Sequence, residues 1–188
     1  RIVGRLVGIS QIISTIHSDN IGSNFTYFLL RITDFMNDIT VVVSNKIKEG
    51  LIEKKVVSEN KIKVIYNGVE SPDLSITEDD IENKKRELKI ENNYPVLLTV
   101  GRLHPVKGHI YLIKAMKLLV DKYPNAKLLL IGDGEERYKL EREVKQLKIE
   151  ECVLFLGEIK AEDIYYRLSD IYVQSSLMEG LPLVLIEA

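Results

Sequence analysis

The sequence predicts an α/β protein built on parallel, doubly wound sheets. Short β-rich runs alternate with amphipathic stretches along most of the 188 residues. Such alternation is typical of parallel strands that helices cover on both faces. Residues 39–44 (ITVVVS) are densely β-branched, as expected for a strand buried on both faces, and from residue 95 the alternation of strand and helix is regular.

Composition and charge restrict the class of protein. Hydrophobic residues make up 45% and charged residues 29%, as in ordinary globular domains. The net charge of -2 gives no positive field for nucleic acid, so we expect no nucleic-acid partner. The single cysteine, Cys152, excludes an internal disulfide framework; it lies among apolar residues and is interpreted as a small buried hydrophobe, and a reducing cytoplasm is expected. No apolar run reaches the roughly 20 residues that a membrane-spanning helix needs.

Residues 1–71 are expected to form part of one domain. Strands are predicted at 12–16, 39–44 and 63–66, and helices at 25–37 and 45–54. Ser44 suits the N-cap of the second helix. The chain has no initiating Met and stops within the apolar run LVLIEA, so we expect it to be a fragment of a longer protein.

Residues 72–94 change character and are expected to form a linker. Ser71-Pro72-Asp73 interrupts the pattern, and residues 77–89 are heavily charged, which indicates a solvated helix. The domain boundary is therefore placed near residue 71.

Residues 95–188 are predicted to form a second, truncated domain. Its expected strands are 96–100, 126–131, 153–156 and 171–174, and its expected helices are 108–123, 135–148, 161–168 and 182–188. Because doubly wound sheets bind ligands at the carboxyl ends of their strands, the four loops that follow these strands are the candidate sites.

The first loop carries two cations next to a helix start. Gly101 allows close approach of a ligand to the backbone, and the helix start provides unpaired N–H groups. Arg102 and Lys107 add fixed positive charge, which suits a diphosphate. Two solvated surface cations remain an equally good interpretation at this point.

The second and third loops give weaker signals. Gly132-Asp133-Gly134 is only a G-x-G, and a strand-to-helix turn needs such residues in any case. In the third loop, Gly157 permits a sharp turn, and the backbone that follows it towards Ile159 could contact the edge of a base. An ordinary turn explains it as well.

The fourth loop contains two carboxylates, Glu179 and Glu187, with Pro182 at the expected first turn of a helix. Glu187 lies among apolar residues. A buried carboxylate needs partners, and ligand hydroxyls would serve. An exposed Glu187 on the outer face of the helix is the alternative.

Together these loops resemble the retaining glycosyltransferases of family 4, which have the two-domain GT-B fold. The matching segments are VGRLHPVKGH (100–109), IGDGEE (131–136), VLFLG (153–157) and EGLPLVLIEA (179–188), the last containing the E-x7-E motif. Earlier, VVVS (41–44) and IYNGVE (65–70) match the end of the family's first domain. The resemblance implies that residues 1–71 are the C-terminal portion of an acceptor-side domain and that 95–188 bind the donor.

The resemblance also implies roles for individual residues. Arg102 and Lys107 would hold the donor diphosphate, Glu179 would lie beside the transferred sugar, and Glu187 would accept the ribose hydroxyls. His17, in TIHS (15–18), would face the sugar from the first domain, while His104 and His109 are expected in outer positions or at the surface. Many relatives have glycine where this chain has Pro182, which cannot donate an N–H. The further donor-binding residues implied are Gly101, Gly134, Ile159, Gly180, Leu181 and Leu183.

The implied substrates are a nucleotide sugar, with UDP as the commonest nucleotide in the family, and a glycan or lipid-linked acceptor. No metal and no other cofactor is expected, since Arg and Lys carry the charge. The inner face of the membrane is an alternative to a wholly cytoplasmic location, through peripheral association of the first domain. A sugar-nucleotide epimerase of similar architecture and a non-catalytic nucleotide-binding module are the alternative functions.

Overall fold

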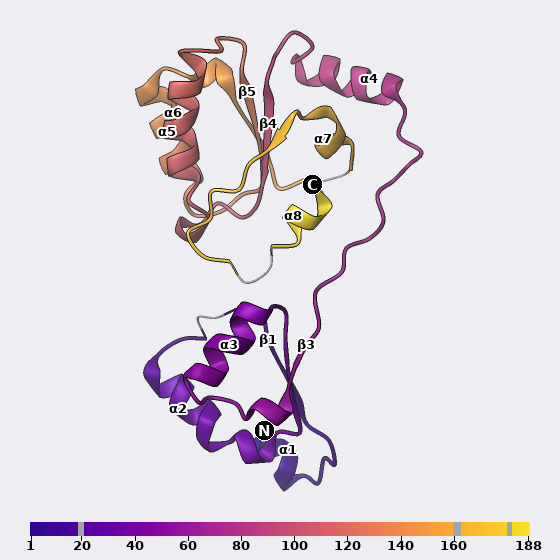
Figure 1. Cartoon of the computed structure of the whole chain (residues 1–188). Helices are drawn as coiled ribbons and strands as arrows, with labels where there is room; N and C mark the ends of the chain where they lie inside the picture. Colours follow the sequence, from indigo (N-terminus) through magenta and orange to yellow (C-terminus); the bar gives the residue numbers. More distant parts are fainter. Residues whose placement is uncertain (19–20, 160–162, 180–181) are drawn as a thin grey trace. The chain divides into compact units, whose positions relative to one another are not determined.

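In a computed structural model the chain forms two compact units (Figure 1). Unit 1 comprises Arg1–Gly68 and Glu179–Leu183, and unit 2 comprises Val69–Met178 and Val184–Ala188. The structure describes residues 1–18, 21–159, 163–179 and 182–188. The division between the units falls three residues before the boundary expected at residue 71, and the segment interpreted as a linker, 72–94, belongs to unit 2.

Unit 1 contains a three-stranded parallel sheet in the order β1-β2-β3. The strands are β1 (Ile13–Ile16), β2 (Ile39–Val42) and β3 (Ile62–Val64), and the helices are α1 (Ile2–Leu6), α2 (Asn24–Ile32) and α3 (Asn45–Glu53), with 3-10 turns η1 (Asp34–Met36) and η2 (Glu59–Lys61). The side chain of Ser44 accepts a hydrogen bond from Ile47 N and caps α3, as the sequence predicts.

The helix expected at 25–37 is shorter in the structure because the side chain of Asn37 bonds to residues of β1 and β2. The α2 helix ends at Ile32, and a 3-10 turn leads to Asn37, whose backbone is extended. Its buried side chain donates to Thr40 Oγ1 at 2.8 Å and accepts from Ser14 Oγ at 2.8 Å. These bonds cross-link β1 and β2 and would be lost if the helix continued through Asn37.

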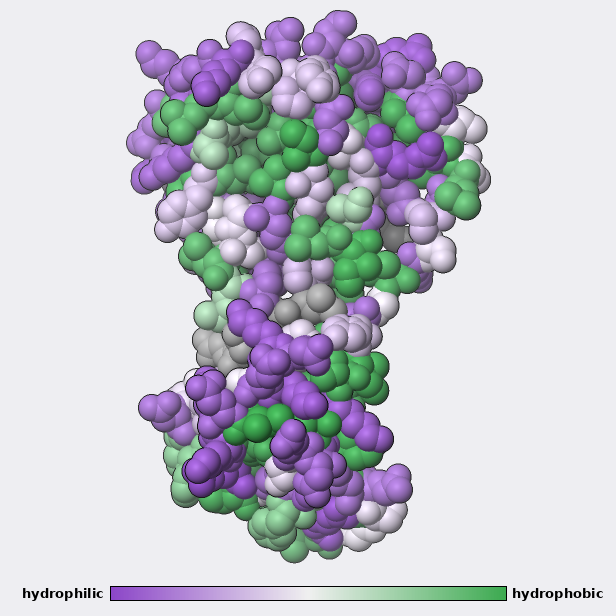
Figure 2. All heavy atoms as spheres, in the orientation of Figure 1, coloured by the Kyte–Doolittle hydropathy of each residue, from purple (hydrophilic) through white to green (hydrophobic). Residues whose placement is uncertain are grey.

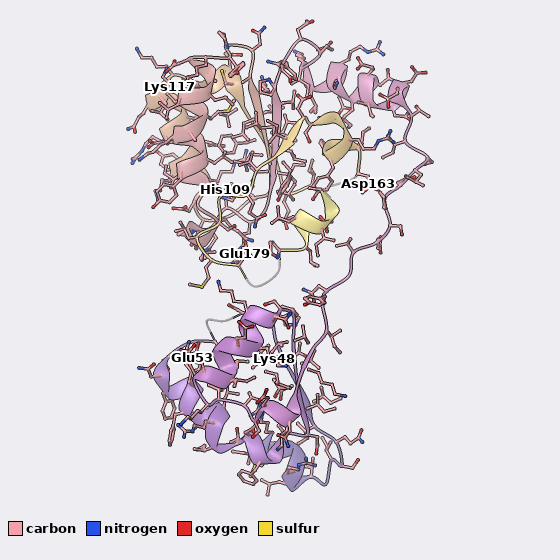
Figure 3. All side chains as sticks on the ribbon, viewed as in Figure 1. Lys48, Glu53, His109, Lys117, Asp163 and Glu179 are labelled. Atoms are coloured by element: carbon pink, nitrogen blue, oxygen red, sulfur yellow. The ribbon has the colours of Figure 1, made fainter. Side chains whose placement is uncertain are left out.

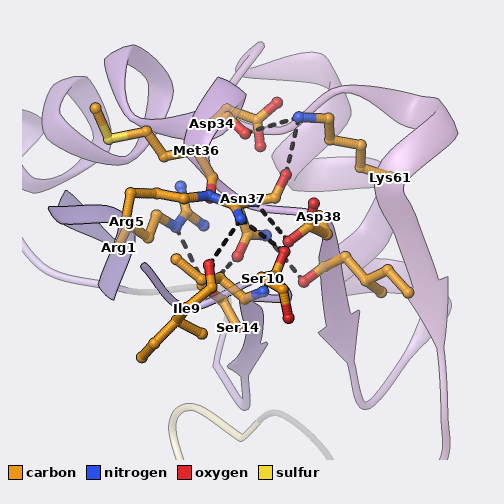
Figure 4. A network of polar contacts seen from close by, with 12 residues as sticks. Arg1, Arg5, Ile9, Ser10, Ser14, Asp34, Met36, Asn37, Asp38 and Lys61 are labelled. Atoms are coloured by element: carbon orange, nitrogen blue, oxygen red, sulfur yellow. Dashed lines mark hydrogen bonds and ion pairs between the residues drawn. The ribbon is translucent and has the colours of Figure 1, made fainter. Parts of the chain in front are cut away.

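A polar network surrounds Asn37 at the amino ends of β1 and β2 (Figure 4). Arg5 pairs with Asp38 at 2.6 Å, and Asp38 also accepts from Ile12 N at 2.7 Å. Lys61 Nζ donates to Asn37 O at 2.8 Å. Because the network lies at the ends opposite to those where doubly wound sheets bind ligands, we assign it to stability.

Unit 2 contains a four-stranded parallel sheet in the order β6-β5-β4-β7. The strands are β4 (Val96–Val100), β5 (Lys127–Ile131), β6 (Val153–Gly157) and β7 (Ile171–Tyr172). The helices are α4 (Glu78–Leu88), α5 (His109–Val120), α6 (Arg137–Leu147), α7 (Asp163–Leu168) and α8 (Val184–Glu187), with 3-10 turns η3 (Pro105–Lys107) and η4 (Glu150–Cys152). None of the helices in the described ranges is long and apolar enough to cross a membrane.

Alternate side chains of the central strands enter two different cores. Leu97, Leu128 and Leu130 belong to the core formed with α5 and α6. Leu98, Leu129 and Ile131 belong to the core formed with α4 and α7. Figure 1 shows the two pairs of helices on opposite sides of β4 and β5. This arrangement confirms the predicted class, an α/β fold with a doubly wound parallel sheet.

The charged helix α4 packs against the rest of unit 2 although it is polar over most of its length. Ile81 in α4 and Ile90, two residues after its end, are buried in the core that α7 also enters. The side chain of Arg167 donates to Ile76 O, and the N–H of Asp73 donates to Asp163, which begins α7 (Figure 3). These bonds fix α7 to the segment that precedes α4.

The surface of unit 2 mixes polar and apolar residues (Figure 2). The short helix α8 has no buried residue, and Leu185 and Ile186 are exposed on it. Cys152 is half-buried against the core of α5 and α6, and burial raises the pKa of its thiol. It therefore acts as a small apolar residue, as the sequence indicates.

Candidate functional site

The strand order of unit 2 creates a switch point between β4 and β7. The chain runs from β4 to β5 and β6 on one side and then crosses back to β7 on the other side of β4. Loops that leave the carboxyl ends of two such strands diverge and leave a crevice, where open α/β sheets bind their ligands. The loop with Arg102 and Lys107 follows β4, and the loop with Ser175 follows β7.

These two loops are joined by hydrogen bonds. Ser175 Oγ donates to Lys107 O at 2.9 Å, and Leu177 N donates to Val106 O at 2.8 Å. Gly108 has φ +66°, and a Cβ there would lie 2.2 Å from Ser175 O. The glycine is therefore required by contact between the loops, which fixes the turn that carries Lys107.

The loops after β4 and β5 are also locked together through their backbones. Gly101 N donates to Ile131 O at 2.9 Å, and Leu103 N donates to Asp133 O at 2.9 Å. A Cβ on Gly132 would lie 2.1 Å from Gly101 O, and one on Gly134 would lie 2.5 Å from Leu103 O. Packing thus explains both glycines of the G-x-G without a ligand.

A hollow of about 460 Å³ opens where these loops meet. This volume lies within the range of about 300–1,000 Å³ that is typical of small-molecule sites. The structure brings together four of the predicted residues here: Gly101, Arg102, Gly134 and Ile159. The other lining residues are Val100, Ile131, Gly132, Asp133 and Glu158.

The cations around the hollow differ in their partners. Arg137 is bonded to Glu141 at 2.8 Å and to Asp133 at 3.1 Å, and these bonds, that to Glu141 foremost, raise the pKa of its guanidinium. The exposed guanidinium of Arg102 has no hydrogen bond or ion pair with the residues that the structure describes. Arg137 therefore offsets the charge of Asp133, while Arg102 is available to an anion.

Lys107 reaches back across the start of its own loop. A Cβ on Gly101 would lie 3.9 Å from both Cδ and Cε of Lys107, so the lysine stem passes over the glycine that lines the hollow. The backbone of Lys107 is fixed at the same time by Ser175, as described above. The loop thus carries two cations close to Gly101: Arg102 follows it directly, and the stem of Lys107 passes over it.

The two histidines of this loop have structural contacts. His104 Nδ1 accepts from Val106 N at 3.2 Å and so caps the turn before Lys107. His109 begins α5 (Figure 3) and is only 2% exposed. Of the two positions expected for it, an outer position around the site or the surface, the surface is therefore excluded. Burial, and next the charge of Lys107, lower the pKa of His109. Its imidazole is therefore neutral at pH 7.

Glu187 lies on the exposed face of α8 rather than in the apolar core. Tyr166 of α7 donates its hydroxyl proton to Glu187 Oε2 at 2.7 Å. The sequence leaves burial and exposure open for Glu187, and the structure shows exposure with a tyrosine partner. Tyr166 cannot be predicted from the sequence, since IYYRLSD (164–170) carries no motif and the contact joins residues 21 positions apart.

The remaining candidates lie outside this part of the molecule or outside the described residues. His17 is exposed directly after β1 in unit 1. Glu179, labelled in Figure 3, and Leu183 are grouped with unit 1. Gly180 and Leu181 fall outside the described residues. Their predicted roles are untested by this geometry.

The comparison with protein families decides the classification. The model of the family described as glycosyl transferases group 1 matches residues 80–188, which contain all of the loops around the hollow. That is more than half of the chain. The chain belongs to the glycosyl transferases group 1.

Individual relatives of this group 1 chain support the same conclusion. An uncharacterized glycosyltransferase of Methanocaldococcus jannaschii is 35% identical over 150 residues, covering 79% of this chain and 36% of the relative. The UDP-Gal:alpha-D-GlcNAc-diphosphoundecaprenol alpha-1,3-galactosyltransferase of Escherichia coli is 29% identical over 200 residues, covering 100% of this chain and 51% of the relative. The chain therefore spans about half the length of these relatives or less.

Solved structures agree on the fold. The crystal structure of HepE from Anabaena in complex with UDP superposes with a TM-score of 0.84 at 23% identity, covering 99% of this chain and 52% of that chain. At this identity the likeness shows the fold alone. It confirms the GT-B type of fold.

Proposed function

We propose that this chain provides the donor site of a glycosyltransferase that moves a sugar from a nucleotide sugar to a glycan or lipid-linked acceptor, with retention of configuration. The observation that carries the proposal is the hollow at the carboxyl ends of β4, β5 and β6, where Arg102 has no partner among the described residues and the stem of Lys107 passes over Gly101. A nucleoside diphosphate presents the charge that these two cations match.

The chemistry follows from where charge develops. When the bond between sugar and phosphate breaks, negative charge grows on the departing diphosphate. Fixed cations that face this charge stabilise the transition state more than the ground state, which is the form of catalysis that usually contributes most. Arg102 and Lys107 supply it from a loop that hydrogen bonds to the loops after β5 and β7 hold in place. The reaction then needs no metal.

The other roles extend from the donor. Glu187 accepts the ribose hydroxyls, and Glu179 and His17 act on the transferred sugar. Gly134 and Ile159 line the nucleotide part of the hollow. The backbone N–H of Leu183 contacts the phosphates, because Pro182 has none to offer.

The known activities and ligands of the relatives support UDP as the nucleotide and a lipid-linked acceptor. The Escherichia coli relative uses UDP-Gal and an acceptor on diphosphoundecaprenol, and HepE has been crystallised with UDP-glucose. We therefore propose a UDP-sugar donor, a role in cell-envelope polysaccharide synthesis, and a cytoplasmic location at the inner face of the membrane.

The test uses a longer protein that contains this chain and measures release of UDP from UDP-glucose, UDP-galactose and UDP-N-acetylglucosamine. Arg102→Ala should lower turnover by about 10²-fold, the cost typical of losing one preorganised charge contact. Arg142→Ala is the matched control, since Arg142 is exposed on α6 away from the hollow. Equal rates for the wild type and both variants would remove the diphosphate role of Arg102.

A further inference from the structure

Tyr166 lies outside the E-x7-E motif but bonds to Glu187, the second glutamate of that motif. Tyr166 lies on α7 and Glu187 on α8, and the tyrosine hydroxyl donates to Glu187 Oε2 at 2.7 Å. Both residues belong to unit 2, so the contact lies within one compact body. A neutral donor on a carboxylate makes a charge-assisted hydrogen bond, which is stronger than a bond between neutral groups.

The tyrosine side of this contact is firmly held. Tyr165 and Leu168, its neighbours on α7, are buried in the core that the sheet forms with α4 and α7. Arg167, the residue after Tyr166, bonds to Ile76 O. The helix α8, in contrast, has four residues and none of them is buried. The hydroxyl of Tyr166 is therefore a fixed point to which an otherwise exposed carboxylate is tethered.

Tyr166 also connects Glu187 to the hollow. Its ring packs against Tyr172 with the centroids 5.9 Å apart, and the Tyr172 hydroxyl lies 3.4 Å from Val100 O, to which it donates. Val100 lines the hollow at the end of β4. The contacts thus run without a break from the carboxylate on α8 to the wall of the proposed donor site.

The bond leaves part of the carboxylate for a ligand. Burial first, and then the bond to Glu187, raise the pKa of the Tyr166 hydroxyl, so it remains a donor throughout the physiological range. It occupies Oε2, and no bond to Oε1 occurs among the residues that the structure describes. A carboxylate held by one oxygen presents the other in a fixed direction, where it can accept from a hydroxyl.

We propose that Tyr166 is a positioning residue, which orients Glu187 so that its carboxylate receives the ribose hydroxyls of the nucleotide. The inference rests on the proposed function, because it requires a nucleotide in the hollow. Preorganisation is the physical gain: the rotamers of an exposed glutamate are restricted before the ligand arrives, so less entropy is lost on binding.

The experiment is a calorimetric titration of this chain with UDP, GDP and ADP. The nucleoside diphosphate that binds is then compared with its 2′,3′-dideoxy form, which has no ribose hydroxyls. We expect Tyr166→Phe to weaken binding of the normal nucleotide about 3- to 10-fold, as loss of a charge-assisted bond would. Binding of the dideoxy form should be the same for Tyr166→Phe and the wild type, a selectivity that a general loss of structure would not produce.

Two further variants separate the explanations. In a Glu187→Ala background, Tyr166→Phe should have no further effect on nucleotide binding, because its target is gone. Tyr138→Phe is the matched control, since Tyr138 is 75% exposed on α6. If the wild type prefers the normal nucleotide to its dideoxy form and Tyr166→Phe binds both unchanged, the positioning role is wrong while the proposed function stands. If no diphosphate binds to folded wild-type chain, both proposals fail.

Discussion

Replacing Gly132 by alanine tests the locked loops that carry Arg102. A Cβ there would lie 2.1 Å from Gly101 O, whereas real Cβ contacts stay above 3.0 Å, so the loops must separate by the difference, 3.0 − 2.1 = 0.9 Å. Gly132 also has φ +130°, which a non-glycine residue adopts only with strain of about 1–3 kcal/mol.

Separation of the loops would also lengthen the backbone hydrogen bonds next to the glycine. Gly132 N donates to Gly157 O at 2.7 Å, and Gly101 N donates to Ile131 O at 2.9 Å. Loss of one such bond costs about 0.5–1.5 kcal/mol. Together with the strain, Gly132→Ala should lower the free energy of unfolding of unit 2 by about 2–4 kcal/mol.

Urea unfolding followed by far-UV circular dichroism measures this change. Gly101→Ala is the control from the same pair of loops, because its Cβ would meet only the Lys107 side chain at an ordinary 3.9 Å. It should change the stability by less than about 0.5 kcal/mol. Equal stabilities for the Gly132 and Gly101 variants would refute the account of the loops.

Two other predictions concern α3 and His109. Ser44→Ala should destabilise unit 1 by about 1 kcal/mol in urea unfolding, because it removes the cap on Ile47 N; an unchanged unfolding midpoint would contradict the capping role. His109 has a pKa lowered from 6.5, chiefly by burial and next by Lys107, with Glu136 opposing. Below pH 6.5 the unfolded chain therefore binds a proton that the folded chain does not, and the stability of unit 2 should fall as the pH drops from 6.5 towards the folded pKa. Urea midpoints at about pH 7.5 and 5.5 should show this loss for the wild type and for His104→Gln but a smaller one for His109→Phe; equal losses in all three would contradict the assignment.

The parts of the fold that the sequence predicts correctly are those whose signal is local, such as an apolar run or a helix cap. The runs at 96–100 and 126–131 are mostly apolar, and they form the central strands β4 and β5, buried on both faces. The cap at Ser44 is likewise a local signal. The expected helix at 25–37 fails at its end because Asn37 bonds to Ser14 and Thr40, and these partners come together only in the folded sheet.

The candidate site shows the same division. That Gly101, Arg102, Gly134 and Ile159 line one hollow could be predicted, since all follow strands that end at one edge of a parallel sheet. The reason for Gly132 and Gly134 could not, because it lies in the approach of two backbone segments that are 31 residues apart in sequence. The contact of Tyr166 with Glu187 could not be predicted for a similar reason, because a contact between two separate helices has no characteristic residue spacing in the sequence.

The central claim is that the β4 loop holds a nucleoside diphosphate, and calorimetric titration of this chain with UDP, GDP and ADP tests it directly. Lys114→Ala serves as the control for Lys107→Ala, because Lys114 is an exposed lysine of α5 outside the hollow. The account predicts that one nucleotide binds to the wild type and to Lys114→Ala with equal affinity, and about tenfold or more weakly to Lys107→Ala. Equal affinity for all three proteins, or no binding by the folded wild type, would contradict it.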